Sequence, residues 1–327
     1  MRKLFAWVLF FVLILGSYQA IQYALDRPEL SRMFSEVKET VDQSIDTFSD
    51  KKEEKAKNIV LKDTTGKQKG TFTNEYGEQW QMMHNGYEQF TLESSNGKGG
   101  YIAGQGRTLF NTTIGETTYG EVQKQYGAPL DEIRKGTKIF KMNDDNKKEM
   151  LLYEIDGYYV TFFFDVHNAN RLRAIQYIPY NVEQKKEGFY GPSSNALRTG
   201  FEQLMIELMN QARVEHGLKP LIYDKGLTAQ ARAHSQDMID QNYFSHTGSN
   251  GSTPESRMKN AGYLNEHFYA ENLAYGQYSS IFAHEGLMNS LGHRKNILNK
   301  DLTHAGVGVA FDAENVPYYT INFYTPF

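Results

Sequence analysis

The most distinctive stretch of the sequence is MNSLGHRKNIL at residues 288–298, and two further blocks precede it, NYFSHT at 242–247 and AENLAYG at 270–276. Together the blocks supply two histidines and one glutamate. Two imidazoles and a carboxylate that meet in one cleft can bind Zn²⁺ and leave a coordination position open. The blocks therefore indicate that the C-terminal part of the chain carries the chemistry.

The sequence around the blocks predicts helices followed by a pair of strands. Apolar residues recur on one helical face over residues 197–212. Ser252-Thr253-Pro254 combines a hydroxyl cap with a proline in the first turn of a helix. The chain closes with strand-like stretches at 306–310 and 318–324. This order predicts an α+β domain over residues 196–327.

In order and spacing, the three blocks resemble the signature blocks of the CAP superfamily in its bacterial form. This is the fold of cysteine-rich secretory proteins and plant pathogenesis-related proteins. The resemblance covers residues 196–327 and implies an α-β-α sandwich with a large central cleft. Residues 61–182 are more loosely similar to the small domain that accompanies CAP domains in some Bacillus-type proteins.

The family's cleft holds two histidines and two glutamates, and the resemblance assigns residues to three of these positions. His246 and His293 match the two histidines, and Glu271 matches the first glutamate. Ser290 stands where the second glutamate would lie, and Leu287 replaces a helix tryptophan. Because the fourth member is absent, any activity attributed to the full set of four is in doubt for this chain.

The chemistry of these residues leaves several roles open. If His246 and His293 bind zinc, a metal-bound water could attack a substrate with Glu271 as general base. Ser290 would line the cleft and could only form hydrogen bonds. In a purely structural role, the two histidines would instead bond to backbone carbonyls and hold loops together, and Glu271 would accept bonds from N–H groups.

Other histidines and one acid are expected to lie outside the site. His234 falls on the apolar stripe of a helix and is expected in the core. His284 and Glu285 are predicted to face solvent; if their side of the helix faces inward instead, Glu285 would be a substitute acid. His84 and His167 are isolated and are predicted to be surface or turn residues.

The amino terminus reads as an export signal. Met1-Arg2-Lys3 precedes an apolar stretch at 4–16, which predicts a signal anchor or a cleaved signal peptide over residues 1–25. The basic end would stay inside and the rest would be exported. Residues 26–60 are strongly charged, with apolar residues at roughly helical spacing, and predict a helical or disordered stalk.

The region between stalk and CAP-like domain has β-strand character. Residues 151–155 and 158–164 flank Asp156-Gly157 and predict a hairpin with a two-residue turn. We expect a smaller β-rich α+β domain over residues 61–182 and a linker over 183–195. The predicted fold is thus α+β throughout: a membrane segment, this domain, and a C-terminal α-β-α sandwich.

Composition narrows the possible functions. The net charge of −4 and the pI near 6.2 give no electrostatic footprint for nucleic acid. The absence of cysteine excludes a thiol nucleophile and any thiolate metal site. A secreted eukaryotic domain usually carries disulfides, so an exported chain without cysteine indicates a bacterial source, and we expect a Gram-positive one.

Two functions and a weaker third follow from these observations. The first is a binding or scaffolding module at the extracellular face of the membrane, or secreted, whose ligand is a lipid, glycan or peptide of the cell envelope. The alternative is a zinc-dependent hydrolase acting on peptide or cell-wall material. The third is a purely structural envelope protein.

Overall fold

The computed structural model divides the chain into two compact units, Met1–Lys52 and Glu53–Phe327, which are described separately. The residues that it describes are 32, 35–40, 43, 59, 61, 67–95, 97–142, 147–264 and 266–327. In the first unit, residues 35–40 are helical and exposed. The membrane segment predicted over 1–25 lies outside the described residues. Among the helices that are described, none has the length and apolar character needed to cross a membrane.

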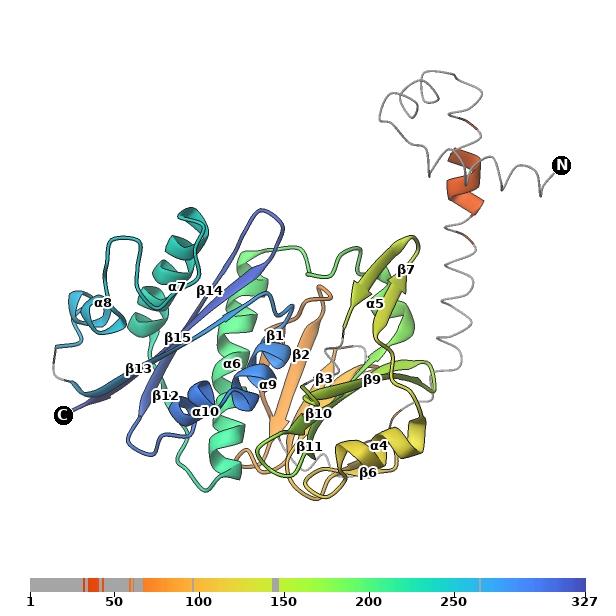
Figure 1. The fold of residues 1–327 in the computed structure, drawn as a ribbon, viewed down its shortest axis with the longest axis horizontal. Helices are drawn as coiled ribbons and strands as arrows, with labels where there is room; N and C mark the ends of the chain where they lie inside the picture. Colours follow the sequence, from red (N-terminus) through yellow and green to blue (C-terminus); the bar gives the residue numbers. More distant parts are fainter. Residues whose placement is uncertain are drawn as a thin grey trace. The chain divides into compact units, whose positions relative to one another are not determined.

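The second unit begins with a seven-stranded antiparallel sheet (Figure 1). In spatial order its strands are β1 (Lys67–Thr73), β2 (Gln79–His84), β3 (Phe90–Ser94), β4 (Gly100–Ala103), β11 (Arg171–Pro179), β10 (Tyr158–Asp165) and β9 (Met150–Ile155). The predicted hairpin is confirmed as β9–β10, in which Ile155 pairs with Tyr158. Asp156 and Gly157 both have positive φ, 51° and 87°. Their conformations therefore allow the tight two-residue turn that matches strand twist.

Short elements surround this sheet. They are β5 (Thr108–Leu109), β6 (Thr112–Thr113), α4 (Tyr119–Tyr126), β7 (Glu132–Lys135), β8 (Lys138–Lys141) and α5 (Tyr180–Lys185). Helix α4 begins at a capping box between Thr118 and Glu121 and buries Val122 against Phe162 and Phe164. The linker predicted over 183–195 begins inside α5, so its first residues are helical rather than extended.

The C-terminal part contains a four-stranded sheet with five helices among the described residues. The strands, in spatial order, are β12 (Ile222–Tyr223), β14 (His304–Phe311), β15 (Pro317–Pro326) and β13 (Glu266–Tyr275). The helices are α6 (Asn195–Glu215), α7 (Lys225–Asp240), α8 (Pro254–Asn260), α9 (Ser280–Asn289) and α10 (Leu291–Ile297). The predicted α+β class and the predicted closing strand pair, β14–β15, are confirmed.

Helices cover both faces of the four-stranded sheet. Val307, Val309 and Ile321 belong to one apolar cluster with residues of α6, α9 and α10. The intervening Gly306 and Gly308 face the backbone of α7 on the other side. Because strand side chains alternate between faces, the short glycines let α7 approach while the branched residues fill the opposite core. The result is a helix–sheet–helix sandwich.

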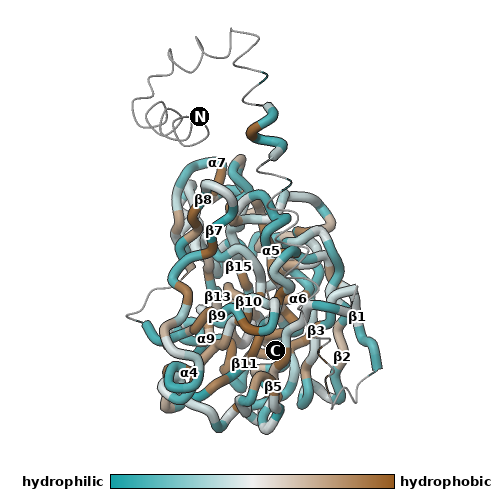
Figure 2. The backbone as a smooth tube through the Cα atoms, turned by 90° about the vertical axis from the view of Figure 1, so that its right-hand side faces the viewer, coloured by the Kyte–Doolittle hydropathy of each residue, from teal (hydrophilic) through white to brown (hydrophobic). Residues whose placement is uncertain are grey.

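The layer formed by α6 and α9 is shared by both sheets (Figure 1). Leu204 and Leu208 of α6 and Phe282 of α9 pack in one cluster with Tyr101 and Phe163 of the seven-stranded sheet. Figure 2 shows hydrophobic backbone segments gathered in the interior around β9 and β11, with hydrophilic segments on the outer turns. The two sheets are therefore joined through a continuous apolar core.

This packing overturns the prediction that His284 and Glu285 face solvent. Both are buried. Arg173 of β11 pairs with Glu285 over an Nε–Oε2 distance of 3.2 Å and donates to His284 Nε2 at 2.9 Å. The Tyr101 hydroxyl donates to Glu285 Oε1 at 2.8 Å. The N-terminal sheet covers the side of α9 that the C-terminal domain alone would leave open, and Glu285 serves the domain interface rather than a cleft.

Of three further histidines whose locations were predicted, two lie where the sequence placed them and one does not. His234 is buried in α7 and its Nε2 lies 3.0 Å from the Ser245 carbonyl, which confirms a core histidine. His167 lies in the turn between β10 and β11, as predicted. His84, in contrast, is a buried strand residue stacked on Tyr87 at 4.1 Å between ring centroids. Aromatic neighbours make its burial favourable, so the surface prediction was wrong.

A buried carboxyl at the junction of the two domains makes stability depend on pH. Glu75 lies in the β1–β2 turn and is only 1% exposed. Burial raises the pKa of Glu75 to about 7, although the Lys186 ammonium opposes the rise. Between pH 4.5 and about 7 the folded chain keeps a proton that the unfolded chain loses. The contribution of Glu75 to stability is therefore present at low pH and lost as pH rises through about 7.

Replacing Glu75 by Gln should remove this part of the pH dependence. A rise in pKa from 4.5 to about 7 corresponds to about 3 kcal/mol in the free energy of unfolding. Urea unfolding of both proteins at about pH 4.5 and about pH 8 measures it. The variant should gain stability relative to the parent at the higher pH. An equal pH dependence in the two proteins would contradict the burial of an ionisable Glu75.

Candidate functional site

Glu271 is the centre of the candidate site. It lies on β13 with its side chain 1% exposed. His246 Nδ1 donates to its Oε1 at 2.9 Å, and Arg257 Nη2 donates to its Oε2 at 2.7 Å. Arg257 Nη1 also donates to the carbonyl of His246 at 3.0 Å. A guanidinium and an imidazole therefore occupy both carboxylate oxygens, which orients Glu271.

Arg257 is a site residue that the sequence did not single out. It lies in α8, whose start is fixed by the Thr253 cap and by Pro254 at its first position. That helix start was predicted, and it places the next turn of the helix against the loop that carries His246. The only feature of the sequence that pointed toward Arg257 was its position one turn into a helix whose start was predicted. Its contact with Glu271 is visible only in the structure.

His246 presents its ring to solvent. Its side chain is 52% exposed, and its Nδ1 is held by Glu271. Among the described residues, no hydrogen bond is made by its Nε2. A carboxylate that binds Nδ1 fixes the tautomer and directs the other nitrogen outward. His246 is thus an oriented, accessible imidazole.

His293 enters the site from α10. Its Nδ1 lies 2.8 Å from the Ser290 hydroxyl, so Ser290 contacts the site through His293. Its carbonyl accepts from Asn272 Nδ2 at 3.0 Å, which ties α10 to β13 beside Glu271. Burial, followed by the charge of His246, lowers the pKa of His293. The surroundings of His293 therefore disfavour its protonated form.

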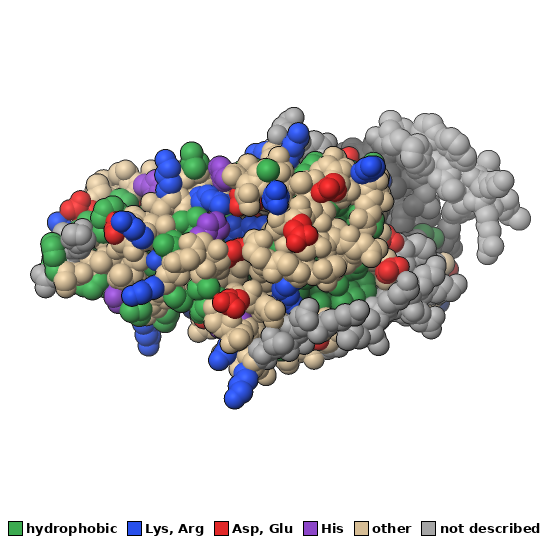
Figure 3. All heavy atoms as spheres, turned by 90° about the horizontal axis from the view of Figure 1, so that it is seen from below, with side chains coloured by type: hydrophobic (Ala, Val, Ile, Leu, Met, Phe, Trp, Pro, Cys, Tyr) green, Lys and Arg blue, Asp and Glu red, His purple; other side chains and the backbone are tan. Residues whose placement is uncertain are grey.

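The N-terminal sheet holds the junction between α9 and α10. The Asn289 side chain accepts from Val166 N at 3.1 Å and donates to the Phe164 carbonyl at 2.9 Å. Asp165, in the same segment, accepts from Arg294 at 2.9 Å. On the face seen in Figure 3, histidine and basic side chains lie close together near the centre of the described atoms. The β10–β11 turn thus fixes the helix that carries His293.

The predicted zinc ligands do not form a three-ligand set. In the part of the chain that the structure describes, no three His, Asp or Glu side chains are arranged to hold a metal ion. Catalytic zinc sites use three protein ligands. Both oxygens of Glu271 are already bound, one of them to a guanidinium that opposes a cation. Zinc binding by His246 and His293 stays a prediction, and no reaction step is derived from it.

Two exposed aromatic residues lie near the site: Phe244 stands two residues before His246 in the same loop, and Tyr275 lies on β13 with Glu271. Phe244 and Tyr275 are 49% and 46% exposed, unusually high values for such large rings. Their centroids lie 5.7 Å apart, and Tyr275 lies 4.5 Å from Tyr318. Glu271 and Tyr275 are four residues apart on one strand, so their side chains leave the same face. We call these three rings the aromatic trio: Phe244 and Tyr275 are accessible, and the buried Tyr318 packs against both of them.

Comparison with known families agrees with this arrangement. The family described as the cysteine-rich secretory protein family, CAP, matches residues 206–323, which include all three blocks of the site. The family described as CAP-associated N-terminal matches residues 55–189. Residues 206–323 therefore form a CAP domain, which a CAP-associated N-terminal domain precedes.

Two Bacillus subtilis (strain 168) proteins are similar to this chain. The uncharacterized protein YkwD is 42% identical over 130 residues, which are 40% of this chain and 49% of YkwD. The uncharacterized membrane protein YlbC is 32% identical over 227 residues, 64% of this chain and 63% of YlbC. The chain therefore spans about half to two thirds of the length of these relatives.

A solved structure extends the likeness to both domains of the chain. It is an extracellular protein containing an SCP domain from Bacillus anthracis str. Ames, with a TM-score of 0.68 and 25% identity. The match covers 82% of this chain and 97% of that one. A cysteine-rich secretory protein from Staphylococcus aureus, at a TM-score of 0.63 and 17% identity, shares the fold. The resemblance found in the sequence is thus confirmed.

Proposed function

We propose that this CAP protein is a binding module outside the cytoplasmic membrane and that its ligand contacts His246 and the aromatic trio. One observation carries the proposal: Glu271, the single acid retained from the family's cleft, is neutralised by Arg257 and oriented toward His246. A general base needs a free oxygen within reach of a substrate proton. Glu271 is therefore suited to orienting an imidazole, and the accessible groups around it are suited to contact.

The location rests on the relatives and on the amino terminus. One relative is named a membrane protein and one solved structure an extracellular protein. The basic and apolar start of this chain predicts export, with or without retention of the segment as an anchor. An exported module of this kind meets the cell wall and the outer leaflet of the membrane.

The chemistry of the surface favours wall material as the ligand. Exposed aromatic faces bind flat apolar groups, and an imidazole adds hydrogen bonding at one edge. Phe244 and Tyr275 offer an uncharged contact surface, whereas lipid headgroups would call for concentrated positive charge. We therefore place glycan or peptide components of the wall on His246, Phe244 and Tyr275.

A pelleting assay with insoluble purified cell wall tests the proposal. The full chain should sediment with the wall, and Phe244→Ala or Tyr275→Ala should weaken binding about tenfold, as expected for loss of an aromatic contact. Phe268→Ala is the matched control, since Phe268 is another exposed aromatic residue of β13 at 42% exposure. It should bind like the parent.

Two outcomes would contradict the proposal. In the first, the trio variants sediment as well as the Phe268 variant, which would remove the surface from the binding site. In the second, the chain degrades wall material and Glu271→Gln abolishes that turnover, which would make the site catalytic.

A further inference from the structure

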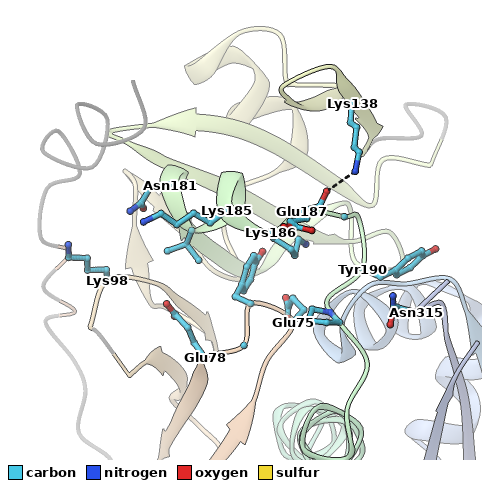
Figure 4. A pocket seen from close by; sticks show the side chains of 15 residues that line it. Glu75, Glu78, Lys98, Lys138, Asn181, Lys185, Lys186, Glu187, Tyr190 and Asn315 are labelled. Carbon is cyan, nitrogen blue, oxygen red and sulfur yellow. Dashed lines mark hydrogen bonds between the residues drawn. The ribbon is translucent and has the colours of Figure 1, made fainter. Parts of the chain in front are cut away.

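A second site lies at the junction of the two domains, in a cavity of about 810 Å³ (Figure 4). One wall is the β1–β2 turn, residues 75–78, and the opposite wall is α5 with the segment that follows it, residues 181–188. Asn315, in the β14–β15 turn, closes one end. None of the residues of the candidate site described above lines this cavity.

The floor of the cavity carries a buried acceptor. Glu75 is almost wholly buried, and its Oε1 has no hydrogen-bond partner among the described residues. A buried polar atom without a partner is costly, and such atoms in native proteins generally await a ligand or water. Oε1 can accept a hydrogen bond from an N–H group that enters the cavity. Glu75 keeps its proton below about pH 7 when the cavity is empty, and an ammonium that binds beside it would favour the ionised carboxylate.

A buried cation next to Glu75 is already engaged by the protein. The Lys186 ammonium lies 4.9 Å from the ring centroid of Tyr76 and 4.5 Å from that of Tyr278. It also lies 3.5 Å from Glu183 Oε1. Because Glu183 and two aromatic rings hold Lys186, it is a fixed part of the cavity floor.

The opening of the cavity carries an excess of positive charge. Lys98, Lys138 and Lys185 border the cavity from three separate segments of the chain (Figure 4). Lys185 is exposed at the end of α5, and Lys138 reaches to 3.5 Å from the Glu187 carbonyl. Glu78 and Glu187 also line the cavity, so three ammonium groups stand against two carboxylates around the opening. The excess of positive charge favours a carboxylate or another small anionic group there. Anion recognition at the rim and an N–H acceptor at the floor therefore face each other across the cavity.

We propose that this cavity binds a small zwitterion of the short-peptide class, with its ammonium on Glu75 and its carboxylate among Lys98, Lys138 and Lys185. The volume lies in the range of small-molecule sites, about 300–1,000 Å³. Tyr76 and Tyr190 also line the cavity and offer apolar surface to the body of the ligand. Because both domains contribute to the walls, the bound peptide bridges them. The site is independent of His246 and the aromatic trio.

Triglycine is the probe that tests this assignment. Titrated into the ¹⁵N-labelled full chain, it should shift the amide signals of Gly77 and Gly188 saturably. N-acetyl-triglycine and triglycinamide, which each lack one charge, should bind more weakly by about tenfold or more. Loss of preference for the doubly charged form would overturn the zwitterion assignment.

Variants separate the two ends of the site. Glu75→Gln should weaken the binding of triglycine and of triglycinamide, because both carry an ammonium. Lys185→Ala should weaken the binding of triglycine without affecting folding. Lys225→Ala is the matched control, since Lys225 is exposed at the start of α7, away from the cavity lining. It should bind like the parent. Equal binding by the Lys185 and Lys225 variants, or no shifts at Gly77 and Gly188 with any probe, would refute the proposal.

Discussion

Replacing Arg173 by Met should destabilise the protein by about 3–5 kcal/mol, because the change leaves the Glu285 carboxylate buried without its cation. The pair joins β11 to α9, and both side chains are buried. Burial raises the pKa of Glu285, while Arg173 opposes the rise, so loss of the cation also favours protonation. Denaturant unfolding monitored by circular dichroism measures the loss.

The double variant Arg173→Met with Glu285→Gln is the control for this prediction. Gln keeps an acceptor for the Tyr101 hydroxyl, and neither residue is then charged. Replacing both members of a buried pair is commonly far less costly than removing one. The double variant should recover most of the lost stability. If it is as unstable as the sum of both single changes, the pair does not act as one interaction.

Gly308→Ala should destabilise by about 3 kcal/mol or more, since it adds a methyl group where backbone already lies. A Cβ at Gly308 would lie 1.9 Å from Arg232 N and 2.3 Å from the Ala231 carbonyl carbon. Both atoms belong to the backbone of α7 and cannot turn aside. The helix would have to move away from β14, and the loop after it, which carries His246, would move too.

Gly286→Ala provides the matched control for the glycine prediction. Gly286 lies in α9, and a Cβ there would meet no atom within 4 Å. Alanine is the better helix former, so this change should be neutral or stabilising by up to about 1 kcal/mol. Thermal unfolding compares the two variants. Similar melting temperatures for both would contradict the close approach of α7 to β14.

Local pattern was sufficient to predict much of the fold. Asp156-Gly157 specified the β9–β10 hairpin, because both positions need positive φ. The helix start at Thr253-Pro254 was equally local. His284 and Glu285 could not be placed in this way, since charged residues are normally exposed and the partner, Arg173, lies on a strand more than 100 residues away. Their burial depends on a domain contact that no local pattern encodes.

The candidate site was predicted in part for the same reason. His246, Glu271 and His293 were found because they stand in distinctive blocks of sequence. The pairing of Glu271 with Arg257 depends on how α8 packs against β13, and that contact determines whether the acid is free. The aromatic exposure of Phe244 likewise becomes visible only in the folded chain. The sequence therefore identified the groups, and the structure changed the chemistry expected of them.

The claim that His246 and His293 share one site is tested most directly by their NMR titration. In the parent protein, His293 should titrate below its ordinary pKa of 6.5, because burial and the charge of His246 both disfavour its protonated form. His246→Ala should raise the pKa of His293, whereas His304→Ala, at the start of β14, should leave it unchanged. A pKa of His293 that does not respond to the loss of His246 would contradict a shared site.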